Sequence, residues 1–193
     1  MTATDIRVFL IDDDEDDYVI TNDLLMDSTH YLFELSWTSD PNVGLAAMID
    51  ESHDIYLVDL YLGYQNGMEL IQKALEGGCS KPLILLTGTN DKEVDLKALE
   101  LGASDYLVKG QFNSQMLERS VLYAIRHKQT LNKLRLSESR YRGLIENQTE
   151  FISRYNLDTT MTYVNQAYVK YFGMPASELV GASWLQFLPE SEQ

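Results

Sequence analysis

The sequence predicts a doubly wound α/β fold for residues 1–113, in which a five-stranded parallel sheet carries helices on both faces. Five short apolar runs alternate along this segment with amphipathic stretches of about ten residues. The runs mostly lack strict polar–apolar alternation, which is typical of parallel strands buried on both faces. Strands and helices that alternate in this way form one sheet through right-handed crossovers.

The predicted strands are the five apolar runs, which are rich in Val, Ile, Leu and aromatic residues: residues 6–11, 33–36, 55–60, 82–87 and 105–109. The predicted helices lie between these runs: residues 17–28, 42–52, 67–78 and 91–102. The third helix has apolar residues on helical spacing and ends at Gly77 and Gly78, a pair that commonly stops a helix.

One long helix is predicted from Ser114 to about residue 147, because this segment has no proline, a single glycine and many good helix formers. Apolar residues recur in it on a seven-residue step: Leu117, Ala124, Leu131 and Ile145. Lys128 and Arg135 occupy seam positions of that repeat, which weakens the coiled-coil pattern. Two interpretations stay open: a last domain helix that packs through residues such as Val121 and then frays, or a continuous signalling helix that pairs with its twin.

A smaller and different pattern follows Glu150. Residues 150–165 predict two short strands around a turn at residues 156–158. Short helices are predicted next, and they end at Gly173 and Gly181.

Composition indicates a globular cytoplasmic protein. The 193 residues are 45% hydrophobic and 23% charged, and no apolar run approaches the roughly 20 residues that span a bilayer. The N-terminus lacks the features of a signal peptide, and a single cysteine, Cys79, excludes an internal disulfide or a zinc cluster. The net charge of −15 argues against nucleic-acid binding, although residues 114–142 form a basic segment between two acidic ones.

Six consecutive acids, Asp12 to Asp17, follow the first predicted strand. Asp12 and Asp13 lie where that strand ends, and later strands end at Asp59, Thr87 and Lys109. Because the carboxyl ends of parallel strands meet at one edge of a sheet, these side chains are expected to cluster. The other four acids are expected to cap and charge the first turn of the next helix, at the positive end of its dipole.

Carboxylates gathered at one edge repel each other unless a positive group lies among them. Oxygen ligands of this kind suit Mg²⁺, and Lys109 supplies a second positive centre. Such a site is suited to phosphoryl transfer. One carboxylate attacks, Mg²⁺ and Lys109 neutralise the developing charge, and the Thr87 hydroxyl holds one oxygen.

Residues 5–127 resemble the receiver domains of bacterial two-component response regulators of the chemotaxis type. The resemblance rests on four motifs that follow the predicted strands: IDDD, LVDLYLGYQNG, LLTGT and DYLVKG. It implies a flavodoxin-like sheet of order 2-1-3-4-5 and a signalling module rather than an enzyme. It also implies a sensor histidine kinase or phosphotransfer protein as the partner that supplies phosphate.

The same resemblance implies roles for the acidic residues. Asp59 would accept the phosphoryl group and share a Mg²⁺ ion with Asp13. Asp12 would act on the metal mainly through water, and the backbone carbonyl of Tyr61 would complete the protein ligands.

The remaining site residues would contact or respond to the phosphoryl group. Thr87 and Lys109 would contact its oxygens, and Gly88 would leave room for it to enter. Tyr106 matches the family's switch aromatic, whose ring moves inward when Thr87 is drawn to the phosphate. The alternative is that Tyr106 is simply an aromatic residue in a buried strand.

The chain departs from the family pattern where the family usually has proline, at Gly63 and Gly110. A Lys–Gly bond strongly prefers the trans form, so a trans bond is expected after Lys109. Tyr61 and Thr89 flank the site and are expected to tune the lifetime of the phosphate.

Residues 137–181 resemble the beginning of a PAS sensor domain, with Tyr163-Val164-Asn165 followed by Ala167 and Tyr168 as the typical residues. The expected domains are a receiver at 1–127, a helical linker at 128–145 and a truncated PAS domain at 146–193. The PAS segment has no His for haem and no Cys for a flavin adduct, so no cofactor is expected there. A homodimer is possible through the last receiver helix and the linker, and no membrane partner is expected.

Two enzyme-like alternatives share some of these features. A phosphatase of the haloacid dehalogenase type also uses a strand-end Asp and Mg²⁺, but it requires a second Asp where Tyr61 stands. A nucleotide-binding α/β protein requires a glycine-rich loop after the first strand, where this chain has acids.

Overall fold

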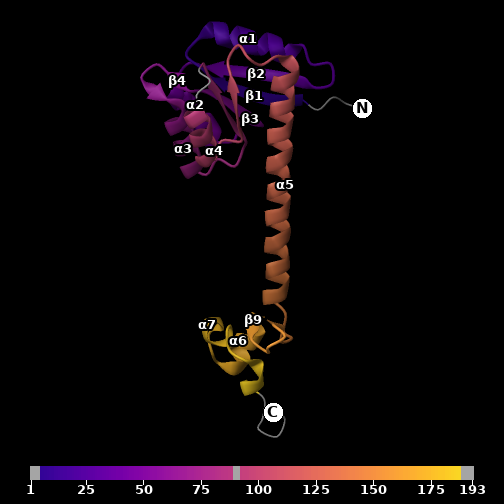
Figure 1. Ribbon diagram of the computed structural model, residues 1–193. Helices are drawn as coiled ribbons and strands as arrows, with labels where there is room; N and C mark the ends of the chain where they lie inside the picture. The colour runs from indigo at the N-terminus through magenta and orange to yellow at the C-terminus, as the bar shows by residue number, and fades with distance from the viewer. Residues whose placement is uncertain (1–4, 89–91, 188–193) are drawn as a thin grey trace. The chain divides into compact units, whose positions relative to one another are not determined.

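The computed structural model describes residues 5–88 and 92–187, and contacts divide the chain into two compact units, Met1–Leu131 and Asn132–Gln193. The first unit is an α/β domain, and the second is a small α+β unit (Figure 1). Among the described helices, none is long and apolar enough to cross a membrane.

The elements of the first unit alternate as predicted. They are β1 (Asp5–Ile11), α1 (Glu15–Met26), β2 (Leu32–Thr38), α2 (Pro41–Ile49), β3 (Ile55–Asp59), β4 (Tyr61–Leu62), β5 (Gln65–Asn66), α3 (Gly67–Glu76), β6 (Leu83–Thr87), α4 (Lys92–Glu100), β7 (Asp105–Val108) and α5 (Ser114–Glu146). The β4–β5 hairpin is the addition that the sequence does not predict, because two-residue polar strands leave no periodic pattern.

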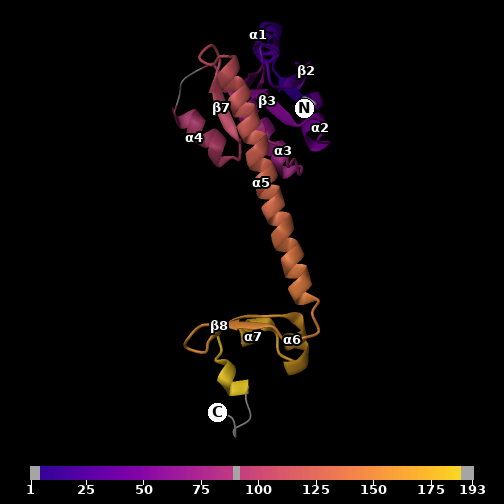
Figure 2. The same cartoon turned by 90° about the vertical axis from the view of Figure 1, so that its right-hand side faces the viewer.

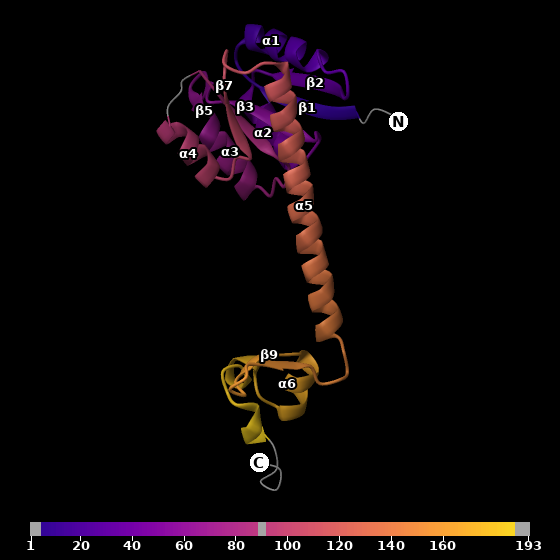
Figure 3. The ribbon, with the colours of Figure 1, turned by 45° about the vertical axis from the view of Figure 1, so that its right-hand side comes forward.

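The main sheet has the order β2-β1-β3-β6-β7 with every pairing parallel, which confirms the predicted 2-1-3-4-5 arrangement (Figure 3). In its register, Ile11 of β1 pairs with Val58 of β3, and Asp59 pairs with Leu86 of β6. The strands that end in polar residues therefore reach the same edge of the sheet at nearly the same level.

Alternate residues of the strands build two separate cores, one on each face of the sheet. Phe9 and Ile11 of β1 pack with residues of α2, α3 and α4. Val8 and Leu10 point to the other face, where they share a core with residues of α1 and α5. Figure 2 shows α5 in front of the strands on this side of the sheet. Burial on both faces explains why the strand sequences are almost uniformly apolar.

Helix α5 is continuous from Ser114 to Glu146, so the interpretation in which it frays after the domain is wrong. Leu117, Val121 and Ala124 are buried against the sheet and α1. Leu117 and Ala124 are therefore unavailable to a twin helix, which removes two of the four positions in the predicted seven-residue repeat. The Ser120 hydroxyl donates a hydrogen bond to the Asp105 carboxylate and ties α5 to the first residue of β7.

The second unit begins within the last turns of α5. It continues with β8 (Ser153–Tyr155), β9 (Met161–Val164), α6 (Gln166–Phe172), α7 (Ala176–Leu179) and a 3₁₀ turn at Trp184–Phe187. β8 and β9 pair antiparallel, as the sequence predicts for two strands around a turn. A small core forms around Met161, Val164 and Leu179.

Candidate functional site

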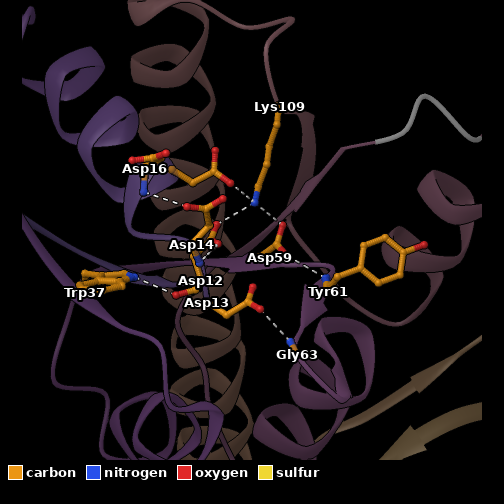
Figure 4. Close-up of polar contacts among 10 residues, drawn as sticks. Asp12, Asp13, Asp14, Asp16, Trp37, Asp59, Tyr61, Gly63 and Lys109 are labelled. Atoms are coloured by element: carbon orange, nitrogen blue, oxygen red, sulfur yellow. Dashed lines mark hydrogen bonds and ion pairs between the residues drawn. The ribbon is translucent and has the colours of Figure 1, made fainter.

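The predicted site residues converge at the carboxyl edge of the main sheet. Asp12 and Asp13 follow β1, Asp59 ends β3, Thr87 ends β6, and Lys109 follows β7. Figure 4 shows Lys109 reaching toward Asp12 and Asp59 across this edge. The residues come from four strands that are neighbours in the sheet, so strand order alone accounts for their meeting.

The Lys109 ammonium lies among three carboxylates. Its Nζ is 2.8 Å from Asp12 Oδ2, 2.6 Å from Asp59 Oδ1 and 2.7 Å from Asp17 Oδ2. An ammonium group has three N–H donors, so these contacts use all of them. Asp12 is fully buried and Asp59 is 5% exposed, so both pairs lie largely out of water.

Burial and charge act in opposite directions on these groups. Burial raises the pKa of Asp12 from 3.8 to about 6, although the hydrogen bond from Lys109 works against it. Burial also raises the pKa of Asp59, again opposed by Lys109. Burial alone would lower the pKa of Lys109, but its hydrogen bonds to the three carboxylates outweigh this and raise it. The site thus holds a permanent cation beside carboxylates that are costly to ionise.

Three of the carboxylates have the geometry of a metal site. Oxygen atoms of Asp12, Asp13 and Asp59 all lie within 4.8 Å of one another. Such a set of hard oxygen donors fits a divalent cation. Backbone groups orient two of them: the Gly63 N–H donates to Asp13 Oδ2 at 3.1 Å, and the Tyr61 N–H donates to Asp59 Oδ2 at 2.9 Å.

The loop that carries Asp12 is anchored from β2. The Trp37 indole N–H donates to the Asp12 backbone carbonyl at 2.8 Å, and the Tyr18 ring stacks on Trp37 at 5.3 Å between centroids. The Asp14 N–H donates to Asp12 Oδ1 at 3.1 Å. The sequence analysis missed this anchor, because a Trp at the end of a strand carries no signal of its partner.

The run of acids divides after Asp13, with one difference from the prediction. Asp14 is the N-cap of α1, and its side chain accepts from the Asp16 N–H at 2.9 Å, as expected. Asp17 does more than charge the first turn, because it contacts Lys109. No sequence signal indicated this contact, because it depends on how the first turn of α1, which begins at Glu15, faces the end of β7.

The predicted phosphoryl contact Thr87 and the predicted switch residue Tyr106 lie on β6 and β7, the two strands nearest Lys109. Thr87 is fully buried at the end of β6, and a Cβ added at Gly88 would meet nothing within 4 Å. Tyr106 is half-buried in β7 and packs against the core on the α3–α4 side of the sheet. Thr89 lies outside the described residues.

The glycines that replace the family's prolines have backbone conformations that proline cannot adopt. Gly63 has φ +61° and Gly110 has φ +75°, whereas the proline ring fixes φ near −65°. No peptide bond among the described residues is cis, so the bond after Lys109 is trans, the form that a Lys–Gly bond prefers. Gly67 has a different constraint, since a Cβ there would lie 1.9 Å from the backbone oxygen of Asp59.

Comparison with known families gives two matches along the chain. A family model described as response regulator receiver domain matches residues 8–121, and a PAS fold model matches residues 139–193. Transcriptional regulatory protein QseB of Haemophilus influenzae is 33% identical over 104 residues, which cover 54% of this chain and 46% of that protein. Response regulator ArlR of Staphylococcus epidermidis is 27% identical over 105 residues, which cover 54% of this chain and 48% of that protein. The chain thus spans about half the length of these relatives.

Solved structures agree with this match. A CheY-like response regulator receiver domain protein from Methanospirillum hungatei is 25% identical with a TM-score of 0.55, covering 66% of this chain and 98% of that chain. The response regulator domain of Thermotoga maritima CheB has a TM-score of 0.55 at 16% identity, over 64% of this chain and 98% of that chain. At that identity the second likeness concerns the fold alone.

Proposed function

This chain belongs to the response regulator receiver family, and from that premise we propose that it is a phosphoacceptor signalling module in which Asp59 is phosphorylated with the help of Mg²⁺. The observation that carries the proposal is the contact between Asp59 and Lys109 beside two further acids, at the edge where the strands end. A histidine kinase or phosphotransfer protein is the partner that such a receiver requires.

Each side chain then has a defined part. Asp59 is the nucleophile, and its second oxygen, which accepts from the Tyr61 N–H, keeps the carboxylate oriented. Asp12 and Asp13, with Asp59 and the Tyr61 carbonyl, would hold Mg²⁺, which when bound neutralises charge on the transferring group. Lys109 and Thr87 would hold phosphoryl oxygens, and Tyr106 would respond to the movement of Thr87 as a switch.

The phosphatase alternative is not supported. A haloacid dehalogenase-type enzyme needs a second Asp two residues after the nucleophile, and the Tyr61 that stands there is 62% exposed. The site does contain further acids, but Asp12 and Asp17 are paired with Lys109. The family match also points to a receiver.

Phosphorylation with a small donor tests the proposal. Incubation with acetyl phosphate and Mg²⁺ is expected to add one phosphoryl group, which intact-mass measurement detects. Asp59→Asn should abolish this addition, because an amide is not a nucleophile toward phosphorus. Asp54→Asn serves as a control at the acid directly before β3, at the opposite end of that strand from Asp59. Labelling that persists in Asp59→Asn, or rapid hydrolysis of many phosphoesters, would contradict the proposal.

We further propose the domain layout 1–127 for the receiver, 128–145 for the linker and 146–193 for the PAS segment. The contact division after Leu131 and the two family-model ranges support it. In this layout α5 belongs to the receiver through its buried half and to the linker through its exposed half. A change at Asp59 that alters the packing of the buried half of α5 would therefore also displace the linker, because both are parts of one helix.

The exposed half of α5 supports a homodimer. Four apolar residues at spacings of three, seven and four are exposed by 36% or more: Leu131, Leu134, Tyr141 and Ile145. Glu138 interrupts this row and pairs with Arg142 at 3.3 Å. The row has the period of a two-helix seam, so a twin helix would cover it.

Light scattering is expected to give twice the chain mass of 22.1 kDa for the wild type. Leu134→Glu should shift the protein to the monomer, because it places a charge in the seam. Leu136→Glu is the matched control, since Leu136 is 63% exposed but lies off the row. A wild-type monomer at about 100 µM, a concentration at which a dimer with a Kd of about 1 µM would be largely formed, would contradict the homodimer.

A further inference from the structure

Asp17 is the one carboxylate at Lys109 that has no other described partner. Its side chain is 27% exposed, and its Oδ2 is 2.7 Å from Lys109 Nζ. It lies on the first turn of α1, a rigid element that packs on the sheet through Leu25. The contact thus joins a helix start to the strand-end lysine.

The other two carboxylates at Lys109 have further partners on their second oxygens. Asp12 Oδ1 accepts from the Asp14 N–H, and Asp59 Oδ2 accepts from the Tyr61 N–H. Both residues also belong to the metal-ligand group, whereas Asp17 does not. If Asp59 becomes phosphorylated, the Asp59 oxygen that holds Lys109 gives way to a phosphoryl oxygen. Asp17 is neither phosphorylated nor part of the metal-ligand group, so neither event removes its contact with Lys109.

We propose that Asp17 is a positioning residue for Lys109, which fixes the ammonium from the α1 side so that its remaining N–H groups point into the phosphoryl site. This inference rests on the proposed function. The Lys109 side chain has a flexible stem of four carbons and is 20% exposed. Without a fixed partner, rotation about the bonds of this stem can turn the ammonium toward water. Asp17 itself makes no contact with the phosphoryl group and transfers no proton.

The rate of phosphorylation by acetyl phosphate at saturating Mg²⁺ tests this role. Asp17→Ala is expected to lower the rate constant by about fivefold, since a reacting group that is held less firmly is productive for less of the time. Asp17→Leu, which is close to aspartate in shape, should lower it similarly and provides a second variant. Asp17→Asn should stay within about twofold of the control, because its amide oxygen still accepts from Lys109.

Asp16→Asn is the matched control. It removes the same charge from the same helical turn, but no described residue pairs with the Asp16 carboxylate. Comparison with this variant separates the contact with Lys109 from the general effect of one negative charge on an anionic donor. Alanine favours a helix, so folding of Asp17→Ala is expected, and a melting curve checks it.

The Mg²⁺ affinity supplies a readout that a metal-binding or merely structural role would change. It should be the same in wild type, Asp17→Ala and Asp16→Asn. Equal phosphorylation rates in Asp17→Ala and Asp16→Asn would overturn the inference, as would a fall in Mg²⁺ affinity that matches the fall in rate. A wild-type protein that is not labelled at Asp59 would instead contradict the proposed function.

Discussion

Asp12→Asn is expected to raise the free energy of unfolding by about 2 kcal/mol at pH 7.5 in the absence of divalent metal. The reason is that burial in the folded protein disfavours the ionised form of the Asp12 carboxylate. Asp12 is fully buried, and its pKa is raised from 3.8 to about 6. A shift of that size corresponds to about 3 kcal/mol. The expected gain is smaller, because one oxygen that accepts from Lys109 becomes an NH₂ group.

The pH dependence of this difference follows from the direction of the shift. Because the pKa of Asp12 is higher in the folded state, the penalty is fully present above about pH 6 and is relieved as the pH falls toward 4. The stability advantage of Asp12→Asn should therefore shrink between pH 7 and pH 4.5. Burial lowers the pKa of His53, which acts in the opposite direction over this range, so the comparison with wild type at each pH is essential.

Urea denaturation in EDTA at several pH values measures the effect, and Asp16→Asn is the control with the same charge change at an exposed position. Mg²⁺ should stabilise the wild type at pH 7.5 by binding only the folded state, and should do so less for Asp12→Asn. A variant that is less stable than wild type at pH 7.5 without metal would show that the Lys109 contact outweighs burial.

Strand order and strand ends made most of the site predictable. A parallel sheet brings its carboxyl ends to one edge, so Asp12, Asp59 and Lys109 could be grouped without knowing any distance. Burial on both faces fixed the strands, because few other elements are continuously apolar over five residues. The positions of the strands and of their ends follow from the pattern of apolar and polar residues, which can be read from the sequence alone.

Contacts between side chains of different elements could not be predicted in the same way. The pair Asp17–Lys109 depends on which side of α1 faces the sheet edge, and the Trp37 anchor depends on the path of the loop after Asp12. The sequence predicted the exposed apolar row of α5 only in part, because residues such as Leu117 fit a seven-residue repeat and a domain core equally well. Packing decides between those uses, and periodicity does not.

Asn165 is another residue whose importance depends on packing. It was recognised as part of a typical PAS sequence, but its neighbours were not. The side chain is fully buried, and its Oδ1 accepts from the N–H groups of Ile152 and Tyr168 at 3.1 and 3.2 Å. Its Nδ2 donates to the carbonyls of Ile145 and Glu150 at 3.2 and 2.9 Å. One amide thus joins the last turn of α5, the loop before β8 and the start of α6.

Glu146 reinforces this junction. Its carboxylate accepts from the Tyr163 hydroxyl at 2.7 Å and from the Gln166 N–H at 2.9 Å. Burial together with this bond raises the pKa of Tyr163 to about 12. The end of the helix is therefore hydrogen-bonded to both β9 and α6, and a movement of α5 would have to carry these elements with it or break the bonds.

Asn165→Ala is expected to destabilise the second unit by about 3 kcal/mol. It leaves the Ile152 N–H without its acceptor, at about 1–3 kcal/mol, and removes the side-chain donors to two backbone carbonyls. The Tyr168 N–H keeps a hydrogen bond, because it also donates to the backbone carbonyl of residue 165 at 3.1 Å.

A small unit has a low free energy of unfolding, so the variant should unfold residues 132–193. The receiver should remain folded and still accept phosphate at Asp59. The chain has one tryptophan in each unit, so a Trp37→Phe background leaves Trp184 as the fluorescent reporter of this unfolding. Phosphorylation is measured separately with Trp37 in place, because its indole anchors the loop that carries Asp12.

Asn147→Ala is the matched control, since Asn147 is exposed and makes one side-chain hydrogen bond, to the Gly143 carbonyl at 2.8 Å. Its effect on the Trp184 transition should stay below about 1 kcal/mol. An unchanged transition in Asn165→Ala would mean that α5 ends independently of the PAS segment. A selective loss of the second unit would instead identify Asn165 as the residue through which the helix leaving the receiver is fastened to the segment that follows it.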